Sequence, residues 1–459
     1  GPASDDVEII KELLLSGMNV ARLNFSHGTH EEHARRIVII RQAAEETKKN
    51  VALMLDTKGP EIRLGFFKEE PVCLKEGDRV TLTTEDIKGD SKLIPVTYNG
   101  LPRDVREGDK ILVADGLIEL KVLSTTDSKV LCLVVVGGEM TSQKGVNVPG
   151  VLLNLPALTK RDIQDIKFGI EHNFDFLAAS FVRKAADVLD IRKVLEEGGA
   201  EIDLISKIEN REAVQNLDEI IKVSNGVMVA RGDLGVEIPV EEVPLLQKTI
   251  IKLCNRVGKP VVTATQMLES MINNPRPTRA EASDVANAIF DGTDAVMLSG
   301  ETAAGKYPLE AVKTMARIAE RAEAALHYEE MLGKKRYVLP QRTVTDAISY
   351  ASCATAQDLG AAAIITSTES GHTAKMVSKY RPQALVVAVT PHAGVMRKLA
   401  LTWGVQPLLA ASRKSTDEMM SSAVEVSLEA GLIKDGDLIV FTAGVPVGMR
   451  GTTNLVRVL

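Results

Sequence analysis

The sequence predicts an α/β fold: a TIM (β/α)8 barrel with an inserted all-β lid domain and a C-terminal doubly wound α/β domain. In the first and third quarters of the chain, apolar strand-like runs alternate with amphipathic helical stretches, as in a parallel sheet covered by helices. Nearly every run ends in polar or charged residues, which is typical of a barrel with its chemistry at the C-terminal ends of its strands. The pattern then changes twice along the chain, and each change predicts a further domain.

The candidate barrel strands number seven, one fewer than a complete barrel contains. The chain begins without a methionine and passes directly into a helical pattern. We therefore expect an additional strand before Gly1 and interpret the sequence as incomplete at its N-terminus. The seven runs are MNVARLNFS (18–26), VALMLDT (51–57), FDFLAASFV (174–182), EIDLISKIE (201–209), GVMVARGDL (226–234), PVVTATQML (260–268) and DAVMLSGET (294–302).

A long insertion separates the second of these runs from the third. Between Thr57 and Pro156 the sequence consists of short β runs broken by Gly-Asp, Asn-Gly and Asp-Gly turns. This pattern predicts an all-β domain at 58–156, between the third and fourth strands of a complete barrel. An insertion at the catalytic face is a candidate lid. The barrel domain then comprises 1–57 and 157–331.

A new βα series begins after about Leu332 and predicts a C-terminal doubly wound α/β domain at 332–459. The charged stretch Gly333–Arg336, with Pro340, is a plausible linker to it. A helix at 344–359 precedes five expected strands, with helices between the first four. These strands are AAAIITS (361–367), ALVVAVT (384–390), VQPLLA (405–410), DLIVFTAG (437–444) and TNLVRVL (453–459).

The composition is that of a soluble globular protein, with 45% hydrophobic and 25% charged residues. The net charge of -7 and the aromatic content of 3% argue against nucleic acid as the main partner. We find neither a signal peptide nor an apolar run long enough to cross a bilayer, and so expect no membrane partner. The four scattered cysteines contain no CxxC pair, which is typical of reduced thiols in a cytoplasmic protein.

The segment DLISKIEN (203–210) carries two charged residues at the end of a predicted buried strand. Burying such charges is costly unless they are paired or hold a metal. Lys207 and Glu209 are two residues apart, so in a strand both side chains point to the same face. This spacing predicts a polar site in front of that face.

Polar residues at the other strand ends would gather around the same barrel mouth. Glu209 and Asp233 follow consecutive strands, so their carboxylates can share a hard cation such as magnesium. Carboxylates, a divalent metal and fixed positive charges around one cleft are what phosphoryl transfer needs. The glycines of ARGDLG (230–235) add a turn whose backbone N–H groups can cradle an anion. The expected mouth residues are Arg22, Asn24, Ser26, Asp56, Thr57, Ser180, Lys207, Glu209, Asp233, Thr265 and Glu301.

Each of these features also has a simpler structural explanation. A single Lys–Glu pair is more often structural than catalytic, and Arg231–Asp233 could form an ordinary turn. Asn24–His27 could merely cap the next helix. The coincidence of many polar groups at the same end of successive strands favours a functional site.

Five motifs resemble the pyruvate kinase family. They are RLNFSHG (22–28), LDTKGPEIR (55–63), ISKIEN (205–210), MVARGDLG (228–235) and TATQMLES (263–270), and the match runs in order across essentially the whole chain. The resemblance implies transfer of phosphate from phosphoenolpyruvate to ADP, giving pyruvate and ATP in the last step of glycolysis.

The resemblance also implies roles for individual residues. Lys207 would stabilise charge on the phosphoryl group and the enolate, Arg22 would contact the transferring phosphate, and Thr265 would lie near the enolate carbon that is protonated. The proton is expected to arrive through a water relay. The expected substrate-binding residues are Arg22, Ser180, Lys207, Gly232, Asp233 and Thr265. The expected nucleotide-binding residues are Pro2, Asn24, His27, Arg63 and the lid residue Lys144.

Two kinds of metal ion are implied. Glu209 and Asp233 match the ligands of Mg²⁺ or Mn²⁺ in the family. The expected ligands of a monovalent cation, usually K⁺, are Asn24, Ser26, Asp56 and Thr57. Family members that need K⁺ tend to carry glutamate at the position of Glu61, whereas lysine stands there in members that do not. We therefore predict K⁺ dependence.

In the C-terminal domain, the segment 366–373 opens a predicted helix with hydroxyl and amide groups and resembles the effector loop of the family. The segment 442–453 resembles the facing loop. We expect activation by a phosphorylated metabolite, and the sequence leaves open whether this is fructose 1,6-bisphosphate, ribose 5-phosphate or AMP. The family is usually a homotetramer. The expected effector residues are Ser367, Thr368, Ser370, Gly371 and Thr373.

Two other interpretations compete with this one. A magnesium-dependent aldolase or mutase also holds a metal between Glu and Asp and stabilises an enolate, but it would not need the lid, Lys144 or Arg63. A non-catalytic regulatory or binding relative would not need Lys207, Glu209, Asp233 and Thr265 together.

Overall fold

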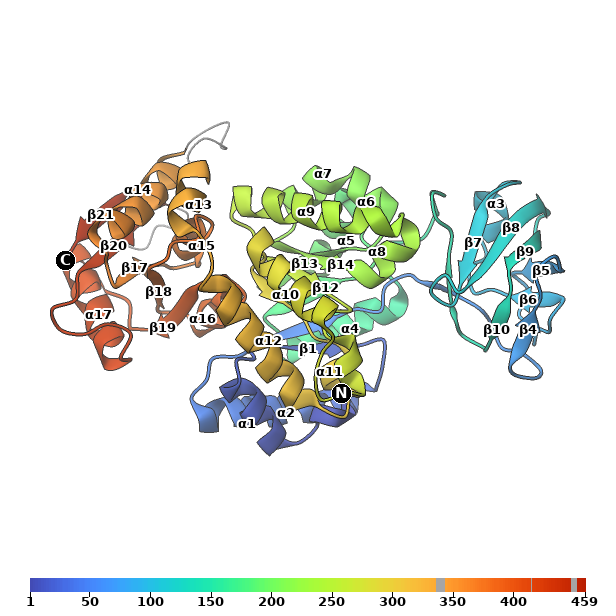
Figure 1. The fold of residues 1–459 in the computed structure, drawn as a ribbon, viewed down its shortest axis with the longest axis horizontal. Coiled ribbons are helices and arrows are strands. Elements are labelled where there is room, and N and C mark those ends of the chain that lie inside the picture. Colours follow the sequence, from blue (N-terminus) through green and yellow to red (C-terminus); the bar gives the residue numbers. More distant parts are fainter. Residues whose placement is uncertain (336–342, 414, 447–451) are drawn as a thin grey trace.

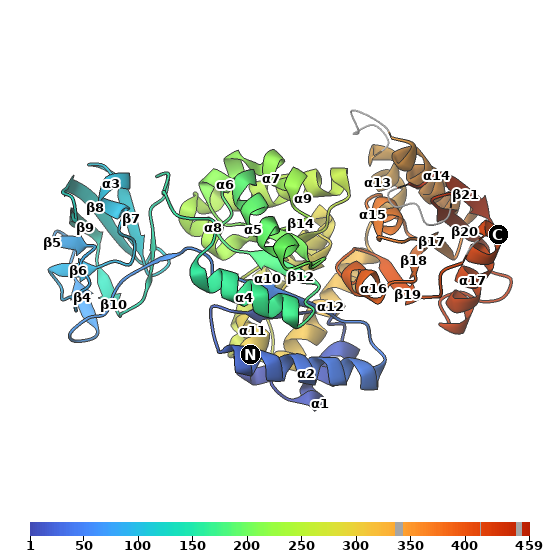
Figure 2. The same cartoon turned by 180° about the vertical axis from the view of Figure 1, so that it is seen from behind.

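The computed structural model describes residues 1–335, 343–413, 415–446 and 452–459. Three bodies lie in a row, with the barrel in the middle, the β domain at one end and the C-terminal domain at the other (Figures 1 and 2). This arrangement confirms the predicted fold class. The boundaries at 57/58, 156/157 and 331/332 stay predictions.

The barrel sheet is parallel, and its strands are neighbours in chain order. The parallel pairing places all the strand C-termini at one end, with Asn24 opposite Asp56. The strands are β1 (Val20–Asn24), β2 (Ala52–Asp56), β12 (Phe176–Ala179), β13 (Asp203–Ile208), β14 (Gly226–Ala230), β15 (Val261–Ala264) and β16 (Ala295–Val296).

The barrel is open between its first and last strands. Among the described residues the sheet has seven strands, and β1 and β16 form its two edges. A cavity of about 1110 Å³ is lined by residues of both edge strands, including Val20 and Ala295. The cavity lies where an eighth strand would close the barrel, and that strand stays a prediction.

Helices cover the outside of the barrel sheet, and their apolar faces pack on the outward side chains of the strands, such as Leu53 and Leu177. Capping boxes at Thr29, Thr159 and Thr278 satisfy the first N–H groups of α2, α4 and α10. No described helix has both the length and the apolar character needed to span a bilayer. The helices are α1 (Val7–Leu15), α2 (His30–Thr47), α4 (Lys160–Glu171), α5 (Ala185–Glu197), α6 (Arg211–Gln215), α7 (Leu217–Val223), α8 (Arg231–Glu237), α9 (Val243–Val257), α10 (Arg279–Asp291), α11 (Gly300–Ala303), α12 (Pro308–Glu323) and α13 (Tyr328–Lys335), with short 3-10 turns η1 (Pro2–Ser4), η2 (Val240–Glu242) and η3 (Glu269–Ile272).

All seven predicted runs are longer than the strands that they contain, and in two of them the residues after the strand are helical. The run 226–234 leaves the sheet at Ala230, because Arg231 begins α8. The run 294–302 has only Ala295 and Val296 in the ladder, and Gly300–Ala303 is helical. In both runs the apolar pattern continues into the turn that follows, and so it does not mark where the strand ends.

The inserted domain is all β apart from one short helix. Its main sheet has the order β3-β11-β7-β8-β9-β5-β6, and β4 pairs with β10. The inward side chains, such as Ile111, Val122 and Cys132, form a core of their own. The elements are β3 (Ile62–Arg63), β4 (Val72–Leu74), β5 (Arg79–Thr83), β6 (Leu93–Pro95), α3 (Leu101–Asp104), β7 (Lys110–Val113), β8 (Ile118–Thr125), β9 (Lys129–Val136), β10 (Gly138–Met140) and β11 (Gly145–Asn147).

The C-terminal domain has a five-stranded sheet with the order β19-β18-β17-β20-β21. Four strands are parallel, and the last one, β21, pairs antiparallel with β20. The linker prediction is corrected in part, because Gly333–Lys335 belong to α13; Arg336 and Pro340 lie outside the described residues. The elements are α14 (Val344–Leu359), β17 (Ala363–Ser367), α15 (His372–Ser378), β18 (Leu385–Thr390), α16 (Ala393–Leu399), β19 (Val405–Leu409), α17 (Thr416–Glu429), β20 (Ile439–Ala443) and β21 (Leu455–Val458).

Candidate active site

A buried ionic cluster lies at the C-terminal ends of β1, β2, β12 and β13. The Lys207 ammonium lies 2.8 Å from Glu209 Oε1 and 3.2 Å from Asp56 Oδ1, and it donates to Ser180 Oγ at 2.8 Å. Arg22 Nε lies 2.5 Å from the other oxygen of Asp56. The Glu209 and Asp56 side chains are each 1% exposed. The two-residue spacing of Lys207 and Glu209 therefore places both groups on one face, as predicted.

The charges in this cluster shift one another's pKa. Burial by itself would lower the pKa of Lys207, but the carboxylates of Asp56 and Glu209 outweigh burial and raise it. Burial also opposes ionisation of Asp56, and Arg22 and Lys207 overcome this effect and lower the pKa of Asp56. Lys207 is therefore a fixed positive charge in a buried site, where such a charge acts strongly on a bound anion.

Glu209 and Asp233 carry negative charge that the protein compensates only in part. Burial raises the pKa of Glu209, and the neighbouring Asp233 carboxylate raises it further against the opposing effect of Lys207. The pKa of Asp233 is also raised, chiefly by burial. Two cations, Arg22 and Lys207, face the three carboxylates of Asp56, Glu209 and Asp233. The carboxylate of the lid residue Asp115 also raises the pKa of Asp233, so negative charge is in excess. A cation fits this surplus.

The donor set also suits a hard divalent cation. Within the described ranges there is no group of three or more His, Cys, Asp or Glu that could hold a metal. Magnesium is commonly bound by one or two carboxylates, with water and substrate oxygens completing its shell. The pair Glu209 and Asp233 therefore meets the requirement of Mg²⁺ better than that of a zinc site.

Thr265 is held in a strained backbone conformation beside the cluster. Its φ is +67°, a value that β-branched residues rarely adopt. Its hydroxyl accepts the Gly232 N–H at 2.7 Å, and Arg231 Nη2 donates to its carbonyl at 2.7 Å. Arg231 is itself fixed by Asp284, whose Oδ1 lies 2.7 Å from Nη1. Strain that is over-determined in this way is typical of functional sites.

Sequence reasoning assigned no role to two groups that shape this site. Arg231 was seen only as part of a turn, although an arginine directly after a buried strand is a signal that it has nearby acceptors. The backbone N–H of Phe181 donates to Glu209 Oε2 at 2.6 Å and fixes that carboxylate. No sequence pattern predicts the contact between Phe181 and Glu209, because it depends on a positive φ of 56° at Phe181.

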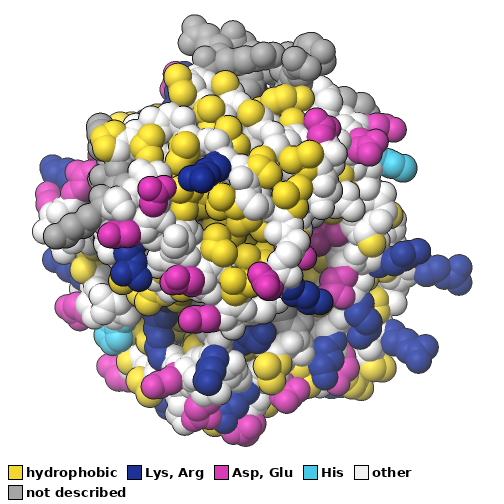
Figure 3. Space-filling view, turned by 90° about the vertical axis from the view of Figure 1, so that its left-hand side faces the viewer, with side chains coloured by type: hydrophobic (Ala, Val, Ile, Leu, Met, Phe, Trp, Pro, Cys, Tyr) yellow, Lys and Arg dark blue, Asp and Glu magenta, His cyan; other side chains and the backbone are white. Residues whose placement is uncertain are grey.

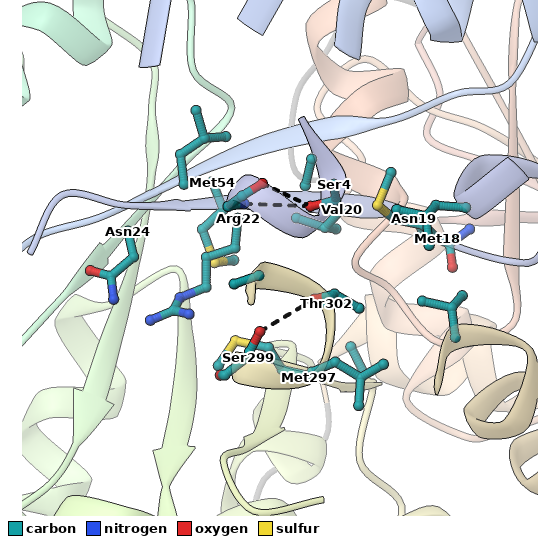
Figure 4. Close-up of a pocket in the computed structure, with 18 of the residues that line it drawn as sticks. Ser4, Met18, Asn19, Val20, Arg22, Asn24, Met54, Met297, Ser299 and Thr302 are labelled. Carbon is teal, nitrogen blue, oxygen red and sulfur yellow. Dashed lines mark hydrogen bonds between the residues drawn. The ribbon is translucent and has the colours of Figure 1, made fainter. Parts of the chain in front are cut away.

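The end of β1 and the loop after it contribute a second group of polar residues. Arg22 and Asn24 point to the same side of β1, facing Met297, Ser299 and Thr302 across the cavity (Figure 4). Asn24 Oδ1 accepts the Ser26 N–H at 3.0 Å. Pro2 and His27 line the same cavity.

Thr57 and Glu301 hold backbone in place around the cluster. Thr57 Oγ1 accepts the Ser180 N–H at 3.2 Å. Glu301 is 3% exposed, and its carboxylate accepts the N–H groups of Leu268 and Ser299. These two side chains therefore stabilise the loops that carry the site.

The lid residue Arg63 is bound by its own neighbours. Arg63 donates to both carboxylate oxygens of Glu61, at 2.7 and 2.9 Å, and to the Gln143 carbonyl at 2.6 Å. Lys58 lies 3.1 Å from the same Glu61. Lys144 lies next to Gln143 in the lid. The lid touches the barrel where Asn147 donates to Glu237 Oε1 at 3.1 Å.

The predicted effector residues surround the start of α15. Gly371 has φ +81° and precedes the helix, and Ser370 is exposed. The Thr373 hydroxyl is hydrogen-bonded to that of Thr453 at 3.0 Å. Ser367 ends β17, and the Thr368 N–H donates to the Val389 carbonyl. Within the facing loop, 447–451 lie outside the described residues.

Comparison with known proteins gives the family. The family model "Pyruvate kinase, barrel domain" matches residues 1–312, and "Pyruvate kinase, alpha/beta domain" matches residues 346–459. The chain belongs to the pyruvate kinase family. It is therefore an enzyme, a glycolytic phosphotransferase for which the family implies phosphoenolpyruvate and ADP as substrates.

Individual relatives agree with this family along the whole chain. A pyruvate kinase of Geobacillus stearothermophilus is 56% identical over 461 residues, which cover 100% of this chain and 78% of the relative. One of Clostridium acetobutylicum is 53% identical over 460 residues, covering 100% and 97% of the two chains. The crystal structure of a pyruvate kinase from Cryptosporidium parvum superposes with a TM-score of 0.96 at 42% identity, covering 100% of this chain and 94% of that one.

The geometry of this pyruvate kinase site divides these predicted residues into three groups. Arg22, Asp56, Ser180, Lys207 and Glu209 form one connected cluster, and the pKa of Asp233 responds to it. Thr265 and Gly232 are bonded to each other beside it. Arg63 and Lys144 form the third group, on the lid.

Proposed function

We propose that the cluster around Lys207 transfers the phosphoryl group of phosphoenolpyruvate to ADP and so produces ATP and pyruvate. The observation that carries this proposal is the buried ammonium group of Lys207 between Asp56 and Glu209 at the mouth of the barrel. The carboxylate of Asp233 lies beside Glu209 and adds negative charge. The bond between the enol oxygen and phosphorus breaks, and a β-phosphate oxygen of ADP bonds to phosphorus. The enolate left behind takes up one proton on carbon and becomes pyruvate.

Each residue has a defined task in this proposal. Lys207 and Arg22 neutralise the phosphoryl oxygens, and Lys207 also stabilises the enolate oxygen. The backbone turn at Gly232 and Asp233, with Ser180 and Thr265, would bind and orient phosphoenolpyruvate. Thr265 would lie near the enolate carbon, to which a water relay would deliver the proton.

Both metal sites are proposed on the residues named above. Glu209 and Asp233 would hold Mg²⁺ or Mn²⁺, which supplies positive charge to the phosphoryl oxygens when bound. Asn24, Ser26, Asp56 and Thr57 would hold K⁺. In support, these four residues supply carbonyl, hydroxyl or carboxylate oxygens, the hard donors that such cations prefer.

The nucleotide is proposed to lie between the barrel and the lid. Pro2, Asn24 and His27 would contact the nucleotide from the barrel, where they line the cavity beside β1, and Arg63 and Lys144 would reach the phosphates from the lid. In this proposal Arg63 exchanges its bidentate contact with Glu61 for a phosphate, an anion with which its guanidinium also forms bidentate hydrogen bonds.

A lactate dehydrogenase-coupled assay tests the proposed reaction. We expect oxidation of NADH that requires phosphoenolpyruvate, ADP and Mg²⁺ together, and omission of any one should stop it. A well-folded chain that forms no pyruvate under these conditions would overturn the proposed reaction.

We predict that the rate depends on K⁺. Replacing K⁺ by Na⁺ or Tris should lower the rate, because the carboxylate at Glu61 leaves the site short of positive charge that a lysine would otherwise provide. The Glu61→Lys variant should retain more of its rate without K⁺ than the parent does. Full activity of the parent in Tris alone would contradict this prediction.

We propose that a phosphorylated metabolite activates the enzyme at the start of α15. In support, Ser370 is exposed, and Gly371 gives the backbone room to approach a phosphate. The expected result is a lower KM for phosphoenolpyruvate in the presence of one of fructose 1,6-bisphosphate, ribose 5-phosphate or AMP, and the loss of this response in Ser370→Glu. Ser421→Glu, on α17, serves as the charge-matched control. If none of the three metabolites changes KM, or if Ser370→Glu responds as the parent does, the proposal fails.

We also propose a cytoplasmic homotetramer. Apolar side chains gather on the outer face of the C-terminal domain (Figure 3), and this domain exposes Val344, Leu359, Val458 and Leu459. Large exposed apolar patches commonly mark protein interfaces. Sedimentation equilibrium should give about four times the chain mass of 49.6 kDa, and a monomeric mass would exclude the assembly.

A further inference from the structure

The loop that follows β1 carries three residues of the proposed cation and nucleotide sites, and side chains of two barrel helices bind its backbone. Residues 24–28, called the β1 loop below, contain Asn24, Ser26 and His27. The side chains that bind this loop come from α2 and α4, helices to which the proposed reaction assigns no residue. Their contacts with the loop therefore need an explanation of their own.

Phe25 is the fixed centre of the β1 loop. Its side chain is 1% exposed. Its N–H donates to the Asp56 carbonyl at 2.9 Å, and its own carbonyl accepts a hydrogen bond from Arg161 Nη2 at 2.9 Å. The ring stacks on that of His33 with centroids 4.1 Å apart, and the centroid of the Phe168 ring lies 5.6 Å away. The backbone and the ring of Phe25 are thus both held by segments outside the β1 loop.

The contact between Arg161 and the Phe25 carbonyl fixes the orientation of the next peptide group. In a trans peptide the carbonyl of one residue and the N–H of the next point in opposite directions. With the Phe25 carbonyl turned to Arg161, the Ser26 N–H points the other way, where Asn24 Oδ1 accepts it at 3.0 Å. The Asn24 side chain and the backbone of Ser26 therefore depend on the hydrogen bond that Arg161 donates.

Arg161 is restrained by a carboxylate on its own helix. Its Nε lies 3.8 Å from Asp165 Oδ2, and the other oxygen of Asp165 lies 2.6 Å from His30 Nε2. The Asp165 side chain is 3% exposed, so α2 and α4 are joined by a buried carboxylate. This carboxylate favours the position from which the guanidinium reaches Phe25.

His33 makes the second contact with the backbone of the β1 loop. Its Nε2 lies 2.9 Å from the His27 carbonyl, and its side chain is 3% exposed. A carbonyl only accepts hydrogen bonds, so Nε2 carries the proton. Burial lowers the pKa of His33, and the ring is therefore neutral at neutral pH with its one donor committed to His27. The φ of +79° at Gly28 then turns the chain tightly onto α2, where a Cβ would lie 2.7 Å from Glu32 Oε2.

We propose that Arg161 and His33 are positioning residues of this site. Arg161 orients Asn24 and Ser26 for the monovalent cation. His33 orients His27 for the nucleotide. This inference rests on the proposed function, which gives these three loop residues their tasks. Groups that orient a metal ligand typically change metal affinity about 10- to 100-fold when they are removed.

The variant Arg161→Met tests the cation half of the inference. We expect the K⁺ concentration that gives half the maximal rate to rise about tenfold or more, while the KM for phosphoenolpyruvate at saturating K⁺ stays unchanged. Arg161→Lys keeps a charged donor and should recover part of this loss. Lys167→Met removes an exposed lysine from the same helix and should leave both quantities unchanged. A merely structural role of Arg161 would lower the fraction of active enzyme, and so kcat, without changing the half-saturating K⁺ concentration.

Thermal unfolding reports K⁺ binding without turnover, because a ligand that binds only the folded state raises Tm. The parent should unfold at a higher temperature in KCl than in NaCl of equal ionic strength. This difference should shrink in Arg161→Met and persist in Lys167→Met. A loss of stability alone would lower Tm in both salts and leave the difference between them intact.

The nucleotide half is tested at His33. His33→Phe keeps a ring that can stack on Phe25 but removes the donor to the His27 carbonyl. We expect the KM for ADP to rise about fivefold, the usual effect of one lost hydrogen bond, with an unchanged KM for phosphoenolpyruvate. His33→Gln keeps an N–H donor on its side chain and should show a smaller rise in the KM for ADP.

The possible outcomes separate this inference from the proposed function. A parental half-saturating K⁺ concentration and a parental Tm difference in Arg161→Met would overturn the role of Arg161. A parental KM for ADP in a folded His33→Phe would overturn the role of His33, and should that variant not fold, the Arg161 variants decide. A parent that does not distinguish K⁺ from Na⁺ would overturn the proposed cation site and the role of Arg161 with it. An inactive parent would overturn the proposed reaction, while the Tm difference would still test Arg161.

Discussion

Replacing Lys207 by methionine is expected to lower kcat for pyruvate formation by at least about a thousandfold, because preorganised charge in a dry site is among the largest contributions to catalysis. Lys207 is the one cation that contacts both Asp56 and Glu209 among the described residues, at 3.2 and 2.8 Å. Methionine keeps a similar chain length but supplies no charge for the phosphoryl group or the enolate. The coupled assay measures the loss directly.

The Lys207→Met variant must be shown to fold before its activity is interpreted. Removing one partner of a buried ion pair typically costs about 3–5 kcal/mol, and here two carboxylates lose a partner. Circular dichroism and thermal unfolding should show a cooperative but less stable protein. Lys248→Met removes a lysine from an ion pair on the barrel surface and should retain full activity. A folded Lys207→Met enzyme with more than a tenth of the parental kcat would exclude the proposed role.

The connected cluster could be predicted from sequence because it depends on local rules. In parallel strands the C-terminal ends meet at one edge of the sheet, and residues two apart share a face. These two rules bring Arg22, Asp56, Ser180, Lys207 and Glu209 together, without knowledge of any tertiary contact. The family resemblance then adds chemistry to a geometry that the pattern already indicates.

The contacts that were missed depend on the approach of distant segments. Arg231 fixes Thr265 from 34 residues away, and Lys398 reaches Asp203 from 195 residues away. Lys398 has no sequence feature that distinguishes it from a solvated surface residue. The position of Arg231 directly after a buried strand indicates nearby acceptors but not which residues they are. The short length of β16 has a similar cause: its ladder depends on a neighbour on one side only, which periodicity cannot reveal.

The motif that contains Glu61 predicts a dependence on K⁺ but not the contacts that the Glu61 side chain makes. Its family position predicts K⁺ dependence, but the carboxylate is bound by Arg63 and Lys58. The same residue therefore holds a proposed nucleotide ligand in place before the nucleotide arrives. Sequence alone did not connect these two tasks.

The Glu209→Gln variant is expected to lose about 10²- to 10³-fold in kcat, the usual effect of removing one preorganised electrostatic contact. Glutamine has nearly the same shape, so the hydrogen bond from the Phe181 N–H can persist. The surplus negative charge of the cluster is reduced, and with it the reason for a divalent cation to bind there. Mn²⁺ binding, measured by electron paramagnetic resonance without substrates, should therefore weaken along with activity.

The metal measurement distinguishes ligation from a purely electrostatic effect on Lys207. Glu237→Gln removes a carboxylate from the same helix as Asp233, but Glu237 is bonded to Asn147 of the lid. If Mn²⁺ affinity falls in Glu209→Gln and not in Glu237→Gln, the cation is held by the specific pair Glu209 and Asp233. Unchanged Mn²⁺ affinity in Glu209→Gln would remove Glu209 from the metal site. Any loss of activity would then be traced to Lys207, whose ammonium would retain only Asp56 as a charged partner.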